Sequence, residues 1–66
     1  MSYLTEMLRK SAEAEKAKAL LTLDLLENSP AGIGEHSDVT EAVIAELNKL
    51  AEADDRLEML DKYFPQ

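Results

Sequence analysis

The chain has 66 residues, of which 45% are apolar, and its 14 acidic and 7 basic side chains give a formal net charge of -7. A chain this short forms one domain at most, residues 1–66, and buries only about 60% of the surface that its unfolded state exposes. The acidic balance argues against a nucleic-acid partner, and the absence of cysteine excludes disulfides and cysteine-bearing zinc sites.

The sequence also gives no sign of membrane insertion or export. No apolar run approaches the roughly 20 residues that span a bilayer, and no basic start followed by an apolar stretch opens the chain. We therefore expect a cytoplasmic protein without a membrane partner. Because a small domain without a disulfide has little core to stabilise it, self-association or another partner is the expected source of added stability.

The first 27 residues predict one long helix. Ser2 can cap its start, and Glu6 lies in the first turn, where the helix dipole favours an anion. No helix breaker follows before Asn28, which tolerates the left-handed conformation of a helix C-cap, and Pro30 blocks continuation. We expect a helix over residues 3–28.

The apolar residues of this helix form two adjoining seams. One contains Tyr3, Met7, Ala14, Ala17, Leu21 and Leu25; the other contains Leu4, Leu8, Ala12, Ala19, Leu23 and Leu26. A flank of charged residues that includes Arg9, Glu13 and Lys16 is predicted to face water. A stripe about 100° wide suffices for one partner helix, so the wider arc predicts more than one neighbour. The alternative is that the alanines only favour helix on a partly exposed surface.

Residues 28–37, which we call the elbow, hold both glycines and the single histidine. We expect Ile33 to plug the end of the core, and Ser37 or Asp38 to cap the next helix. The elbow is long for a helix connection, which invites a functional interpretation. However, a lone Gly-x-Gly is weak evidence for phosphate binding, and His36 lacks the Glu-x-x-His partner of a di-metal site. We therefore expect no cofactor and no metal.

The second arm predicts a helix over residues 38–64 with a coiled-coil type of seam. Its 4-3-4-3 spacing includes Val39, Val43, Glu46, Leu50, Ala53, Leu57, Leu60 and Phe64. Antiparallel folding is expected to place Leu21 opposite the Glu46–Leu47 turn, Ala17 opposite Leu50, Ala14 opposite Ala53, Met7 opposite Leu60, and Tyr3 opposite Phe64. The predicted core of the hairpin and of a dimer is Met7, Ala14, Ala17, Leu21, Val43, Leu50, Leu57, Leu60 and Phe64.

Acidic residues crowd the second half of this arm: Glu52, Asp54, Asp55, Glu58 and Asp61. A solvated face is the simplest interpretation, and a docking face for a basic protein is the functional one. A calcium site would require ligands from a turning loop, which a straight helix does not supply.

The elbow pattern from Asn28 to Asp38 and the ending from Glu52 to Phe64 resemble short uncharacterised helical-hairpin proteins of marine tailed phages and ocean metagenomes, over residues 15–64. That resemblance implies a viral origin, with action in the host cytoplasm, and brings no assigned activity.

The sequence therefore predicts an all-α, antiparallel two-helix hairpin that dimerises into a four-helix bundle. We expect a non-enzymatic interaction protein, because no nucleophile-base pair or room for a pocket is visible. The alternative is a small acidic regulator or inhibitor that imitates nucleic-acid charge and docks on a basic protein surface.

Overall fold

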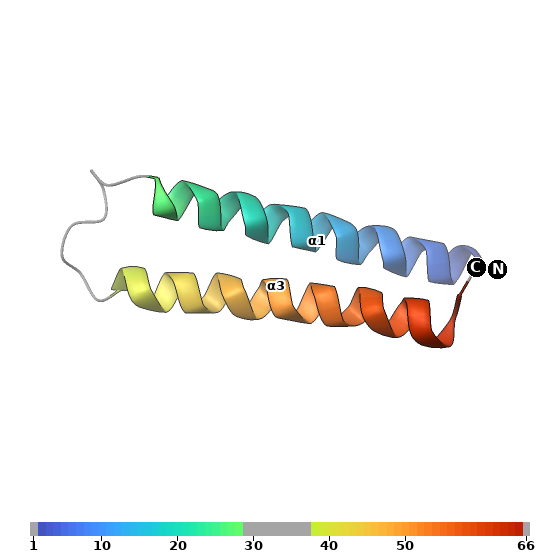
Figure 1. Cartoon of the computed structure of the whole chain (residues 1–66). Coiled ribbons are helices and arrows are strands. Elements are labelled where there is room, and N and C mark those ends of the chain that lie inside the picture. Colours follow the sequence, from blue (N-terminus) through green and yellow to red (C-terminus); the bar gives the residue numbers. More distant parts are fainter. Residues whose placement is uncertain (1, 29–37, 66) are drawn as a thin grey trace.

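The computed structural model describes residues 2–28 and 38–65, and within these ranges the chain forms two α-helices. α1 spans Tyr3–Glu27 and α3 spans Asp38–Tyr63. The two helices lie side by side and antiparallel, so that the first turn of α1 and the last turn of α3 share one end of the hairpin (Figure 1). The predicted all-α hairpin is confirmed, and each helix ends one residue earlier than expected.

The two ends of α1 are closed by side chains. Ser2 is the N-cap, as predicted: its hydroxyl accepts a hydrogen bond from the Thr5 amide at 3.2 Å, and its backbone is extended. Asn28 caps the other end differently from the prediction, because its φ of -104° is not left-handed. Instead, its side-chain amide donates to the Asp24 carbonyl at 2.9 Å and to the Asp24 carboxylate at 3.0 Å.

Several predictions for the elbow fall outside the described residues. These are the plug at Ile33 and the cap at Ser37, and His36 also falls in this range. Asp38 is the first residue of α3, and its side chain also lies outside the description.

Small residues form the line along which the two helices meet. Ala12 and Ala53 are completely buried, Ala19 is 2% exposed and Thr5 is 8% exposed. Thr5, Ala12 and Ala19 are spaced seven residues apart, so they recur on the same side of α1 and let the backbone of α3 approach closely. Leu60, at 7% exposure, is the one large apolar side chain that is buried among the described residues.

The predicted core residues of α1 are wrong, because this line of small residues is the one that faces α3. The seam of Ala12 and Ala19 faces α3, whereas Met7, Ala14, Ala17 and Leu21 are all exposed in the hairpin. On α3 the prediction is closer: Leu60 is buried, and Val43, Leu50 and Leu57 are half-buried.

The open end of the hairpin is also different from the prediction. Phe64, which was predicted to belong to the core, is 56% exposed, and Tyr3, at 93%, and Tyr63, at 61%, are exposed as well. The helices end together at this point, so no further turn of either helix covers the three rings.

The residues of α1 that face α3 are not those predicted to oppose it, because Ala14, Ala17 and Leu21 are exposed. On one edge of the hairpin, ion pairs join Arg9 with Asp61 and Lys16 with Asp54. The residues that do face α3 are the smaller ones beside the predicted seam, which permit the closer approach.

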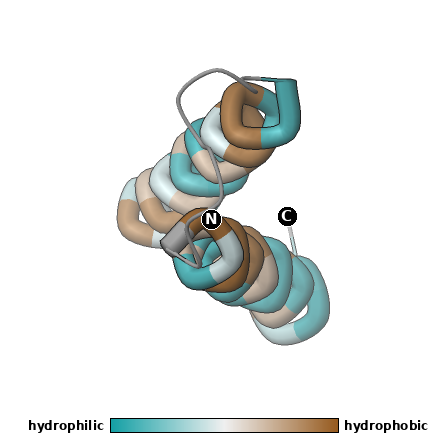
Figure 2. The backbone as a smooth tube through the Cα atoms, turned by 90° about the vertical axis from the view of Figure 1, so that its left-hand side faces the viewer, coloured by the Kyte–Doolittle hydropathy of each residue, from teal (hydrophilic) through white to brown (hydrophobic). Residues whose placement is uncertain are grey.

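The hairpin is a thin rod of 49 × 14 × 13 Å. Its accessible surface is 5113 Å², whereas the size scaling of compact monomers gives about 4,200 Å² for a chain of 7.3 kDa. Figure 2 views the rod along its length and shows hydrophobic residues interspersed with hydrophilic ones along both helices. Within the described ranges, neither helix is long and apolar enough to cross a membrane.

Candidate interaction surfaces

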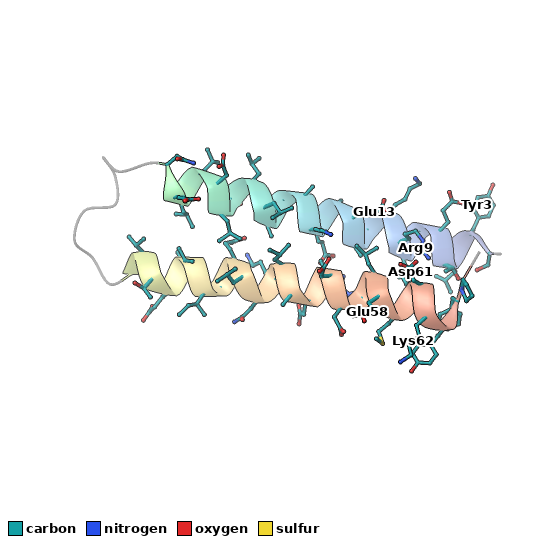
Figure 3. The ribbon with its side chains drawn as sticks, viewed as in Figure 1. Tyr3, Arg9, Glu13, Glu58, Asp61 and Lys62 are labelled. Carbon is teal, nitrogen blue, oxygen red and sulfur yellow. The ribbon has the colours of Figure 1, made fainter. Side chains whose placement is uncertain are left out.

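Ion pairs tie the edges of the hairpin together. Among the side chains that the structure describes, three of these pairs join the two helices: Arg9 with Asp61, Lys16 with Asp54 at 2.9 Å, and Arg56 with Glu15 at 3.1 Å. Figure 3 shows Arg9 and Asp61 pointing toward each other between the helices. The predicted water-facing flank of α1 is therefore only partly a water face, because Arg9 keeps 20% of its side chain exposed and Lys16 keeps 41%.

The predicted acidic docking face is divided by these ion pairs. Asp54 and Asp61 are directed to the cations of α1, and Glu52 lies 4.0 Å from Arg56 on its own helix. Among the described residues, Asp55 and Glu58 have no ion-pair partner and are exposed. Of the predicted docking face, Asp55 and Glu58 therefore keep an unpaired charge within the described residues, and Glu58 lies at the edge of α3 that borders α1.

A shallow charged groove of about 440 Å³ follows the edge where two of the ion pairs lie. It is lined by Arg9, Glu13, Lys16, Asp54, Leu57, Glu58 and Asp61. Charges of both signs alternate in it, so it presents no single field to an ionic ligand. In the described part of the chain, no group of three or more His, Cys, Asp or Glu side chains is placed to hold a metal ion.

Apolar side chains are conspicuous on the surface. Within residues 2–28 and 38–65, twelve large ones are at least 36% exposed: Tyr3, Leu4, Met7, Leu8, Leu20, Leu21, Leu25, Ile44, Leu47, Met59, Tyr63 and Phe64. Seven of the twelve belong to α1, although this helix has already used one apolar seam for α3. The predicted second seam is therefore present as an exposed surface.

The outer side of α1, turned away from α3, carries that second seam. Met7 is 60% exposed, Leu21 and Leu25 are each 58% exposed, and Ala14 and Ala17 between them are also exposed. Figure 3 shows Tyr3 at the start of this helix, directed away from α3. Both seams were predicted from the sequence, but the seam that faces α3 is the one that was not assigned to the hairpin.

Glu46 is the one polar member of the α3 seam. Its side chain is only 17% exposed, and its carboxylate accepts a hydrogen bond from Lys49 at 3.1 Å. Lys49 remains 64% exposed, so this pair is a local contact within α3 and does not link the helices.

We expect the change of Glu46 to leucine to raise the free energy of unfolding by about 1 kcal/mol. The half-buried carboxylate loses hydration in an apolar seam and gains only a local contact with Lys49, whereas leucine would bury apolar surface there. Urea titration monitored by helical circular dichroism measures the change. Glu52→Leu is the matched control, since Glu52 is 78% exposed, and it should leave the midpoint nearly unchanged. A lower midpoint for Glu46→Leu would contradict the prediction.

Comparison with protein-family models, with curated proteins and with solved structures finds no match to this chain. The exposed apolar side of α1 and the acidic residues of α3 are therefore the features on which a functional proposal rests.

Proposed function

We propose that the protein is a non-enzymatic interaction protein, a helical hairpin that pairs with a second copy to form a four-helix assembly and presents an acidic surface to other proteins. The observation that carries this proposal is the set of twelve large apolar side chains that are exposed in the two described helical segments of the single hairpin. Monomeric soluble proteins rarely expose contiguous apolar patches larger than a few hundred Å², and larger patches mark interaction sites.

The second support is the surface area. The hairpin exposes about 900 Å² more than a compact monomer of its mass, since its surface of 5113 Å² exceeds the expected value of about 4,200 Å². One partner of a standard protein interface buries about 800 Å². The excess is similar in size to the area that one partner of such an interface buries.

Sedimentation equilibrium over the micromolar range tests the self-association. The expected result is a particle of twice the 7.3 kDa chain mass, with a thermal midpoint that rises with protein concentration. A folded monomer throughout this range would contradict the proposal.

A second candidate function is that of an acidic regulator or inhibitor, which docks on a basic protein through the exposed acidic residues of α3. It is favoured by the charge of α3, which has eight acidic and three basic side chains. It is also favoured by Asp55 and Glu58, which are exposed and have no ion-pair partner in the part of the chain that the structure describes. The resemblance to phage proteins would place this activity in the host cytoplasm.

This second candidate predicts capture of basic proteins that weakens with salt. The triple variant Glu52→Gln, Asp55→Asn, Glu58→Gln should lose the capture, whereas Glu13→Gln on α1 should retain it. A yield that does not respond to salt would count against the acidic docking surface.

A further inference from the structure

The outer side of α1 has a regular pattern that the hairpin does not use. Positions 4, 7, 11, 14, 18, 21 and 25 are all exposed and follow the 3-4 spacing of a coiled-coil seam. They are occupied by Leu4, Met7, Ser11, Ala14, Lys18, Leu21 and Leu25, which we call the outer seam. The large members Leu4 and Met7 are each 60% exposed.

The outer seam is symmetric about its middle. Large apolar residues occupy both ends, polar Ser11 and Lys18 come next, and Ala14 stands at the centre. An antiparallel second copy would therefore place Leu4 against Leu25 of that copy and Ala14 against its own counterpart. A twofold interface requires such a self-complementary surface, because both subunits use the same patch.

The distribution of charge also favours α1 over α3 as the helix through which two copies associate. α1 carries four basic and five acidic side chains, whereas α3 carries three basic and eight acidic ones. Contact between two copies of α3 would oppose surfaces of net charge -5, which are repulsive at short range. Contact between two copies of α1 keeps both acidic helices on the outside.

We propose that two copies associate through the outer seam of α1, antiparallel, with the twofold axis close to Ala14. The helices then lie in the order α3, α1, α1, α3. This inference rests on the self-association proposed above and identifies the surface through which the two copies associate. It also differs from a square bundle, because the outer seam lies away from α3 and so the second copy adds on the far side of α1.

Cysteine cross-linking tests the arrangement, because the chain has no cysteine of its own. Ala14→Cys is compared with Ala51→Cys, since both alanines are exposed and Ala51 lies on α3. A disulfide requires Cα atoms within about 7 Å, which only a residue near the twofold axis can satisfy. Under mild oxidation, Ala14→Cys should become a covalent dimer almost completely, and Ala51→Cys should remain mostly monomeric on a non-reducing gel.

A charged substitution gives the second measurement. Leu21→Glu would place a carboxylate in the outer seam of each copy, and the dimer should weaken by at least about 100-fold. Ile44→Glu is the matched control on α3, where Ile44 is 51% exposed, and it should leave the dimerisation unchanged.

The outcomes separate this inference from the proposed function. If the unaltered protein sediments as a dimer but Ala14→Cys fails to cross-link, the outer seam is not the interface, while self-association stands. If the unaltered protein is a folded monomer, both proposals fall. If Leu21→Glu unfolds, the cross-linking of Ala14→Cys alone decides between the faces.

Discussion

Replacing Leu60 by alanine is expected to lower the free energy of unfolding by about 2–3 kcal/mol. Leu60 is the one large apolar side chain buried among the described residues, at 7% exposure. Its truncation removes apolar contact where α3 meets α1 and leaves a gap that two rod-like helices close only in part. The expected cost is at the lower end for a leucine because the gap lies near solvent at the edge of a thin rod.

Urea unfolding followed by helical circular dichroism, at one fixed protein concentration, measures this loss. A small hairpin has little stability to spare, so Leu60→Ala should lose much of its helical signal even without denaturant. Met59→Ala is the matched control: Met59 precedes Leu60 on the same helix but is 36% exposed. An equal loss in the two variants would show that Leu60 is not the anchor of the helix contact.

The importance of Leu60 was predictable from the sequence, whereas the side of α1 that it faces was not. The 4-3-4-3 pattern of α3 selects one seam, and Leu60 belongs to it. α1 has two seams of similar apolar content, and periodicity alone does not decide which of them faces the neighbour.

A signal that could have decided between the seams of α1 lies in the charges. Arg9 and Lys16 are seven residues apart, as are Asp54 and Asp61. Antiparallel helices bring such pairs together only if Ala12, between the two cations, faces α3, and this is the arrangement that the structure shows. Exposed ion pairs add little stability, about 0–1 kcal/mol each, but their spacing carries information about register.

The helix ends were predictable to different degrees. The Ser2 cap follows from residue type, because a serine hydroxyl before a helical run is suited to the free amides of the first turn. The conformation of Asn28 does not follow in this way. Its side chain can either accept a left-handed backbone or donate to the preceding turn, and the nearby Asp24 carbonyl and carboxylate favour donation.

The second large effect is expected for Ala53→Leu, which should lower the free energy of unfolding by about 1–3 kcal/mol. Ala53 is completely buried, and the small residues of α1 lie across from it, so three added carbons have no space unless the helices separate. Ala51→Leu is the control, because Ala51 is exposed and leucine and alanine have similar helix propensity. Its effect should remain within about 0.5 kcal/mol.

Separation of the helices by Ala53→Leu should also be visible in the neighbouring ion pair. Lys16 reaches Asp54, the residue after Ala53, at 2.9 Å. If the added side chain moves α3 away, the coupling between Lys16 and Asp54 in a double-mutant cycle should fall toward zero, whereas in Ala51→Leu it should persist. A stable Ala53→Leu variant with the coupling intact would contradict close packing at this position. The buried alanines would then not be what selects the seam of α1 that faces α3.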